Sequence, residues 1–208
     1  MLIIKKKRRN NQSFFFVEIG ANDGKTGDPM FDLISKYHLP GIMVEPVPYL
    51  FQRLLDNYKH EKNLFFENAA IGDSGKGLTF YSLPETPGLP VWHNQLGSFR
   101  KDIILKHRFA IPNIEELILE EEINVISFDD LMKKYSVAQI SLLFIDTEGY
   151  DYEIIKTIDF ENYDIENILF ENKHLSFEEH NDCITYLKAQ GFNKIITYGG
   201  DTLAQKKV

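Results

Sequence analysis

Acidic and amide residues that come directly after apolar runs are the residues of this chain whose types and spacing could do chemistry. Glu18 lies near the end of an apolar run, residues 14–19, and borders the turn 20–24 (GANDG). A second apolar run, residues 41–44, is followed by Glu45, about 25 positions after the first glycine of the turn. That spacing is typical of an acidic residue that accepts hydrogen bonds from ribose hydroxyls. Together these residues predict a site for a ligand that carries a nucleoside.

The chemistry of the turn discriminates between such ligands. A dinucleotide site needs the pattern G-x-G-x-x-G, but Asn22 stands where the second glycine would be, and Glu18 would repel a pyrophosphate. A carboxylate here could instead accept hydrogen bonds from the ammonium group of S-adenosylmethionine, which carries no phosphate. Lys25 follows Gly24 as in a P-loop, but only three residues separate Gly20 from Gly24, where a P-loop has four. The turn therefore favours S-adenosylmethionine over NAD and argues against an NTPase.

Polar residues also follow the other predicted parallel strands. In an open parallel sheet the ligand lies outside the carboxyl ends of the strands, so we expect these residues to converge. They are Asn68 after the third strand, Asp146 and Glu148 after the fourth, and Glu171, Asn172 and His174 after the fifth. An acidic residue just before a helix also serves as an N-cap, which is the structural alternative for Asp146 and Glu148.

Short apolar runs alternate with helical patterns along the chain, which predicts βαβ units and a parallel sheet. The predicted strands are residues 14–19, 41–44, 64–66, 140–145 and 165–170, with a terminal pair at 192–198 and 203–204. Helices are expected after Pro29, after Pro48, after Ser127 or Asp129, and over residues 150–158 and 177–190. A turn is expected at residues 72–77 and an extended segment at 78–83. This segment could form a hairpin with the third strand instead of being joined to the sheet by a crossover.

The length of 208 residues suits one α/β domain, which we predict over residues 14–208. Residues 1–13 contain a basic run and are expected to form a solvated arm. Residues 84–113 are rich in proline and glycine and predict a loop-rich insertion, a candidate lid or acceptor-binding loop. A disordered surface excursion is the alternative. Within it, Trp92 and His93 are candidates for acceptor contact, with packing or solvent exposure as the plainer explanation.

Composition excludes several classes of function. The formal net charge of −8 argues against a general nucleic-acid surface. No apolar stretch is long enough to cross a membrane, and no signal peptide is recognisable, so membrane insertion is not expected. The single cysteine, Cys183, fits a reducing compartment, and we expect a cytoplasmic protein. The sequence specifies no oligomeric state.

Four motifs, in this order, resemble the FkbM family of S-adenosylmethionine-dependent methyltransferases. They are residues 17–24 (VEIGANDG), 44–46 (VEP), 68–72 (NAAIG) and 144–151 (FIDTEGYD), with 127–131 (SFDDL) and 168–171 (ILFE) as further similar positions. The resemblance implies an α/β protein with the Rossmann-like class I methyltransferase fold. That fold has a mostly parallel seven-stranded sheet, an antiparallel last strand and helices on both faces.

The same resemblance implies roles for the cofactor-binding residues. Gly20, Ala21, Asn22 and Gly24 would form the loop under the methionine part, with Glu18 at its ammonium group. Glu45 would accept hydrogen bonds from both ribose hydroxyls. The adenine would lie beside Asn68 and Ala69.

Methyl transfer to oxygen needs a base near the acceptor hydroxyl. His174 is one candidate, because histidine titrates near neutral pH, and Asp146, Glu148 and Glu171 are candidates if burial raises their pKa values. A second arrangement resembles magnesium-dependent catechol-type O-methyltransferases, with Asp146, Glu171 and Asn172 as oxygen ligands of Mg²⁺.

The sequence thus predicts an S-adenosylmethionine-dependent O-methyltransferase that acts on a hydroxyl of a sugar, glycan or secondary-metabolite intermediate. A non-catalytic nucleotide-binding or scaffold domain of the same fold is the alternative from another class. An NAD-dependent oxidoreductase is the second enzymatic alternative.

Overall fold

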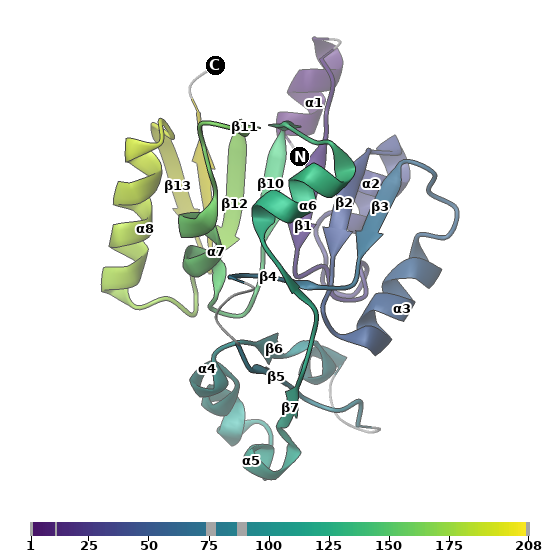
Figure 1. The fold of residues 1–208 in the computed structure, drawn as a ribbon, viewed down its shortest axis with the longest axis vertical. Helices are drawn as coiled ribbons and strands as arrows, with labels where there is room; N and C mark the ends of the chain where they lie inside the picture. Colours follow the sequence, from purple (N-terminus) through teal and green to yellow (C-terminus); the bar gives the residue numbers. More distant parts are fainter. Residues whose placement is uncertain (1, 11, 74–77, 87–90, 207–208) are drawn as a thin grey trace.

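A seven-stranded sheet forms the centre of the computed structural model, which describes residues 2–10, 12–73, 78–86 and 91–206 (Figure 1). In sheet order its strands are β13 (Lys194–Tyr198), β14 (Asp201–Gln205), β12 (Asn167–Glu171), β10 (Leu142–Ile145), β1 (Phe16–Ile19), β2 (Gly41–Val44) and β3 (Leu64–Glu67). The strands from β12 to β3 are parallel, and β14 runs antiparallel to both β12 and β13. The predicted α/β sheet, with its antiparallel last strand, is confirmed.

Helices cover both faces of this sheet, because the central strands are apolar on both sides. One core contains residues of α6 (Phe128–Tyr135), α7 (Asp151–Thr157) and α8 (Phe177–Ala189). The other contains residues of α1 (Leu2–Arg9), α2 (Phe31–Tyr37) and α3 (Pro48–Asn57). Successive residues of β1 point to opposite faces, so Val17 joins the first core and Phe16 the second. Glu18, between apolar neighbours, is the polar exception in β1.

The N-terminal segment is a packed helix, and the prediction of a solvated arm is wrong for it. Ile4 is 2% exposed and joins the second core. The Lys7 ammonium donates to the Ser13 carbonyl oxygen at 3.1 Å and forms an ion pair with Glu166 at 2.5 Å. Lys7 shares the inner face of the helix with Ile4, three residues earlier. The aliphatic part of Lys7 can therefore pack against the core while its ammonium group contacts Ser13 and Glu166. The number of basic residues in this segment does not predict such packing.

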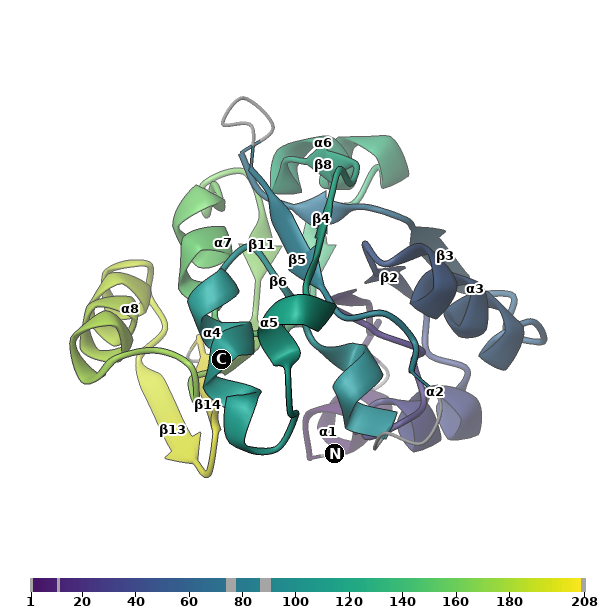
Figure 2. The same cartoon turned by 90° about the horizontal axis from the view of Figure 1, so that it is seen from below.

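The insertion forms an ordered unit with a small apolar core of its own, containing Leu83, Leu96, Ile104, Ile111 and Ile114. Its sheet has the order β6 (Gly97–Ser98), β5 (Phe80–Ser82), β7 (Leu119–Glu121), and its helices are the 3-10 helices η1 (Val91–Gln95) and η2 (Lys106–Phe109) with α4 (Lys101–Leu105) and α5 (Ile114–Leu117). It lies beyond the carboxyl ends of the parallel strands (Figure 2). The alternative of a disordered excursion is wrong for its described part.

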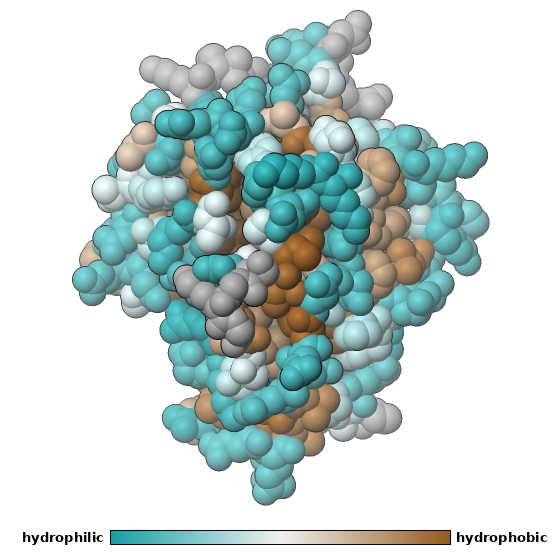
Figure 3. Space-filling view, in the orientation of Figure 1, coloured by the Kyte–Doolittle hydropathy of each residue, from teal (hydrophilic) through white to brown (hydrophobic). Residues whose placement is uncertain are grey.

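The chain enters and leaves this unit through a short parallel pair, β4 (Ala70–Ile71) with β8 (Val125–Ile126). The hairpin considered for residues 78–83 is wrong, because β5 pairs with β6 and β7 and not with the third strand of the central sheet. Most of the turn expected before it lies outside the described residues. Figure 3 shows a strip of apolar side chains between α6 and the small sheet, on a face that is otherwise mostly polar.

The predicted fourth strand is interrupted, although it has the expected position. Residues Gln139–Ile140 form β9, which pairs with β11 (Asp164–Ile165), and β10 begins at Leu142. Between them, the Ser141 hydroxyl accepts a hydrogen bond from the Phe15 amide at 3.3 Å. No helix among the described residues is long and apolar enough to cross a bilayer.

Replacing Lys7 by alanine tests the packing of α1. The change removes the contacts with Ser13 and Glu166, so we expect the free energy of unfolding to fall by about 1–3 kcal/mol. Lys5→Ala, at an exposed position of the same helix, should change it by less than about 0.5 kcal/mol. Urea unfolding of both variants measures the difference. Equal effects would indicate that α1 is a solvated arm.

Candidate active site

The turn after β1 lies directly against the turn after β10. Gly20 has φ +85°, and a Cβ on it would lie 1.8 Å from the Asp146 carbonyl oxygen, so only glycine fits. The Asn22 amide donates to Glu45 Oε2 at 2.8 Å, and the Val47 amide donates to Glu45 Oε1 at 2.9 Å. Glu45 therefore links the turn after β1 to the turn after β2, at the carboxyl ends of the parallel strands. Its burial raises its pKa to about 7.

A cleft follows this edge between the central sheet and the insertion. Its narrow part, about 40 Å³, is lined by Glu45, Ala70, Ile71 and Phe99 among others. Its wider part, about 320 Å³, is lined by residues that include Glu18, Asp28, Asp146, Glu171, Lys173 and His107. Both parts share Gly20, Asn22, Gln95, Asp146 and Glu148, so they are two ends of one site.

Glu18 is a buried carboxyl group with one unpaired oxygen, and it shares a side-chain hydrogen bond with Asp28. It is 2% exposed, and its Oε2 has no hydrogen-bond partner in the described chain. Burial raises the pKa of Glu18 well above its usual value, and the negative charges of Asp28 and Asp146 raise it further. Burial also raises the pKa of Asp28, to about 6. An ammonium group at this end of the cleft would supply the missing donor and offset the crowded negative charge.

The turn after β10 is held in an unusual backbone conformation. Glu148 has φ +50°, which costs energy for a residue with a side chain, and Gly149 has φ +90°. A Cβ on Gly149 would lie 3.1 Å from both His174 Cβ and Ile103 Cγ1. The Ser98 hydroxyl donates to the Glu148 carbonyl oxygen at 2.8 Å. The turn is thus wedged between the insertion and the end of β12, which fixes the Glu148 side chain.

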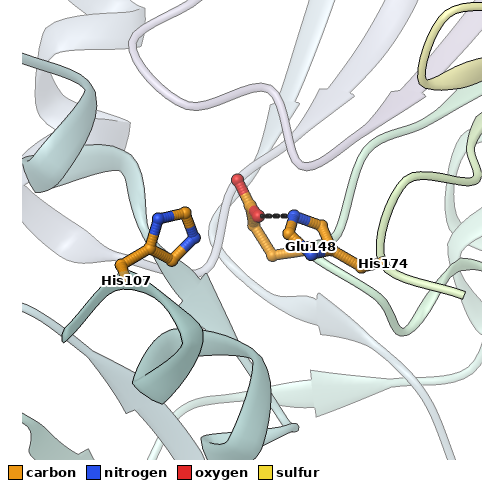
Figure 4. A group of neighbouring side chains, drawn as sticks. All are labelled: His107, Glu148 and His174. Carbon is orange, nitrogen blue, oxygen red and sulfur yellow. Dashed lines mark ion pairs between the residues drawn. The ribbon is translucent and has the colours of Figure 1, made fainter. Parts of the chain in front are cut away.

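Two histidines, His107 and His174, meet the Glu148 carboxylate beside this turn (Figure 4), and the Glu171 carboxylate lies close to His174. His174 Nε2 forms an ion pair with Glu148 Oε2 at 2.8 Å and lies 3.6 Å from Glu171 Oε2. His107 approaches from η2, with its ring centroid 6.2 Å from that of His174. Burial acts to raise the pKa of Glu148, yet the positive charges of His174 and Lys173 hold it below its usual value.

The carboxylates behind this group are crowded. Burial raises the pKa of Asp146 well above its usual value, and the charges of Glu171 and Asp151 add to the effect. Burial and the nearby Glu148 also raise the pKa of Glu171, although Lys173 forms an ion pair with it at 2.7 Å. Asp151 is fully buried, which raises its pKa to about 8. At neutral pH Asp151 therefore retains a proton that a solvent-exposed carboxyl group would have lost.

Most residues predicted for the site line the cleft or contact a residue that does. Those that line it are Glu18, Gly20, Ala21, Asn22, Glu45, Asp146, Glu148 and Glu171, and His174 contacts Glu148. His93 is fully buried, whereas Trp92 is 41% exposed and lines the wider part. The roles of these residues remain proposals.

Three residues predicted to bind the cofactor are placed elsewhere. Gly24 is a packed turn residue, because a Cβ there would lie 2.4 Å from Leu54 Cδ1. The Asn68 amide donates to the carbonyl oxygens of Glu45 and Pro46, and Ala69 is buried away from the cleft. The next two residues along the chain line it instead.

The magnesium set is also not formed as predicted. The Asn172 side-chain oxygen accepts a hydrogen bond from the Thr202 hydroxyl at 3.0 Å, so it is not available as a ligand beside Asp146 and Glu171. The antiparallel strand β14, which carries Thr202, takes up that side chain. The sequence placed Asn172 at the correct strand end but could not show which way it points.

His107 and Asp28 are the main residues of the cleft that sequence reasoning missed. His107 lies in the insertion about 40 residues before Glu148, and no motif links the two. Asp28 directly precedes the Pro29 of a predicted helix start, and its Oδ1 accepts a hydrogen bond from the Met30 amide at 2.6 Å. Its second role, as a buried charge near Glu18, depends on the path of the chain between β1 and α2.

The fold and the cleft define a class of protein. The sheet order, with the last strand inserted antiparallel beside β12, is that of class I methyltransferases. Two solved structures are similar over most of this chain. One is methyltransferase FkbM from Methylobacillus flagellatus KT (TM-score 0.54, 14% identity, 93% of this chain and 43% of that chain). The other is the N-terminal domain of human METTL16 in complex with SAH (TM-score 0.53, 10% identity, 100% of this chain and 66% of that chain).

The family follows from the sequence itself. The Methyltransferase FkbM domain matches residues 18–194, and the chain belongs to this family. The resemblance stated from its motifs is thereby confirmed. The chain spans less than half the length of the Methylobacillus protein. A comparison with curated proteins gave no match.

The buried Asp151 predicts a specific dependence of stability on pH. Its pKa is higher in the folded than in the unfolded chain, so the folded state keeps a proton longer and stability falls as pH rises from about 4 through 8. Asp151→Asn removes this ionisation. We expect it to raise the free energy of unfolding at pH 9 by at least about 1.4 kcal/mol, the equivalent of one pKa unit, and to change it little at pH 4.

Urea unfolding at both pH values measures this effect. Asp164→Asn, at an exposed position, is the matched control and should show no such dependence. An Asp151→Asn effect of the same size at pH 4 and pH 9 would contradict the assignment.

Proposed function

We propose that this chain is an S-adenosylmethionine-dependent O-methyltransferase that acts on a hydroxyl of a small-molecule or glycan acceptor, such as a sugar or a secondary-metabolite intermediate. The observation that carries the proposal is the make-up of the cleft. Glu45 lines the narrow part, which suits a nucleoside, and buried Glu18 lines the wider part, where an ammonium group would find an acceptor. The carboxylates of Asp146, Glu148 and Glu171 line the same wider part, and His174 contacts Glu148. Membership of the FkbM family supports the same activity.

The residues present fit the methyl donor better than a dinucleotide. Glu18 has an orphan oxygen that an ammonium group would satisfy, and Glu45 can accept from ribose hydroxyls while it holds the Asn22 and Val47 amides. The apolar side chains of Ile71 and Phe99 in the narrow part suit an adenine ring. A pyrophosphate would instead face Glu18 and Asp28 across the wider part. An NAD-dependent oxidoreductase is disfavoured for that reason.

When bound, S-adenosylmethionine supplies a methyl group on a positively charged sulfur. The acceptor oxygen must form its bond to the methyl carbon as the carbon–sulfur bond breaks, and the hydroxyl proton must leave to a base. Asp146, Glu148, Glu171 and His174 surround the place where that proton would go. The raised pKa values of Asp146 and Glu171 make these carboxylates better proton acceptors than exposed ones.

Calorimetric titration with S-adenosylhomocysteine, with NAD in parallel, tests the cofactor. We expect only the former to bind, and Glu45→Gln to weaken it by about 1.5–3 kcal/mol for each charge-assisted hydrogen bond lost. Because Glu45 accepts best when ionised and its pKa is about 7, affinity should rise from pH 6 to pH 8 in the wild type, and less so in Glu45→Gln.

Glu116→Gln, at an exposed position of the insertion, is the control and should leave affinity unchanged. Preferential binding of NAD would overturn the proposal. Binding of S-adenosylhomocysteine without turnover of any acceptor would instead favour a non-catalytic domain of this fold.

His174→Ala tests the chemical end of the cleft. We expect turnover to fall about 10²- to 10⁴-fold, the usual contribution of a positioned acid–base group. The affinity for S-adenosylhomocysteine should stay within about threefold, because His174 is not among the residues that line the cleft and contacts it through Glu148. The rate of S-adenosylhomocysteine formation measures this, with an acceptor found by screening monosaccharides and phenols. Near-normal turnover would remove His174 from the chemistry.

A further inference from the structure

We propose that His107, Glu148 and His174 bind one divalent transition-metal ion of the zinc class, which joins the insertion to the carboxyl edge of the sheet. The three residues come from η2, from the turn after β10 and from the segment after β12, and they converge on one point (Figure 4). Among the described residues they are the group of histidine, cysteine and acidic side chains with ligand atoms close enough to share an ion.

The spacing of the ligand atoms fits such an ion. One ligand atom from each residue lies within 4.8 Å of the others. In a tetrahedral site with ligands about 2.0–2.2 Å from the ion, the ligand atoms are about 3.4 Å apart, so these atoms must approach one another by up to about 1.4 Å to reach the required arrangement. Small side-chain rotations complete it.

The same atoms lack other partners. His107 Nε2, His174 Nε2 and Glu148 Oε2 are buried and have no hydrogen-bond partner in the described chain, although the last two form an ion pair with each other at 2.8 Å. Buried polar atoms are nearly always paired, so three such atoms directed at one another require an explanation. A cation at their centre pairs all three at once.

The donor set and the charge select the kind of ion. Imidazole nitrogen suits zinc, iron, nickel and copper, whereas magnesium prefers oxygen ligands in an octahedral arrangement. Two histidines and one glutamate also form the ligand set of some catalytic zinc sites, which leave a coordination position open. Around this point the cleft has three carboxylates, Asp146, Glu148 and Glu171, against the single described ammonium of Lys173. A divalent ion offsets that excess of negative charge.

An open coordination position would face the wider part of the cleft, which His107, Glu148, Asp146 and Glu171 line. An acceptor hydroxyl bound there would lose its proton more readily. His174 would then act as a ligand, and Asp146 or Glu171 would take the proton. This extension rests on the proposed methyl transfer, whereas metal binding can be measured without any turnover.

The single tryptophan provides the readout. The Trp92 ring centroid lies 5.6 Å from that of His107, so a bound Co²⁺ ion should quench the intrinsic fluorescence of Trp92. The experiment titrates the chelator-treated, full-length protein with Co²⁺ and, by calorimetry, with Zn²⁺. We expect saturable binding of one ion per chain. Mg²⁺ at a large excess should not displace Co²⁺.

Two variants locate the ion. His107→Ala and Glu148→Gln should each weaken Co²⁺ and Zn²⁺ binding by about 100-fold or more, beyond the 10- to 100-fold typical of outer-shell residues. His60→Ala, at an exposed position away from the cleft, should bind as the wild type does. Circular dichroism confirms that each variant is folded, and His107→Gln replaces His107→Ala if that variant unfolds.

Failure of the folded wild-type protein to bind either ion would overturn the proposal, and so would unchanged affinity in His107→Ala. Binding of S-adenosylhomocysteine is measured in the same samples. Because Glu18 and Glu45 lie outside the ligand set, loss of the metal site leaves that binding in place, and a failure of the metal proposal is distinguishable from a failure of the methyltransferase proposal.

Discussion

The close approach of two backbone turns is the constraint on which the site depends. Gly20 after β1 packs against the Asp146 carbonyl after β10, with no room for a side chain between them. This contact sets the distance between the two halves of the cleft. It brings the Glu45-bound loop, suited to the nucleoside, beside the turn that carries Glu148. A change at either turn would therefore alter cofactor binding and acceptor chemistry together.

Bringing strand ends together also concentrates negative charge. Buried Glu18, Asp151 and Glu171 lie close to half-buried Asp28 and Asp146, and burial raises the pKa of each. The free protein carries this as a cost to stability at high pH. Bound cationic groups relieve it, since an ammonium group near Glu18 and a metal ion beside Glu148 would each favour the ionised carboxylates. The folded state is thus adapted to its ligands, at some expense to itself.

The sequence predicted the parts of the site that follow from local order. A carboxylate or amide directly after an apolar strand has to lie at the sheet edge, so Glu18, Glu45, Asp146 and Glu171 could be placed without coordinates. The sequence could not show which way a side chain points, or which residues distant in the sequence reach the cleft. Asn172 turns toward Thr202 on a strand that is distant in sequence, and His107 reaches the cleft only through the packing of the insertion. The packing of Lys7 could not be predicted, because its ion-pair partner Glu166 is distant in the sequence.

The short parallel pair of β4 and β8 has a consequence for how this family can diversify. Both ends of the insertion connect to the central domain through this strand pair, and the insertion has an apolar core of its own. Mutations between the two strands can therefore accumulate without shifting the register of the seven central strands. The Gly20 turn and Glu45, which we propose hold the nucleoside, would be retained while the insertion that carries Phe99 is exchanged. Specificity for a new acceptor could then arise by replacing the insertion alone.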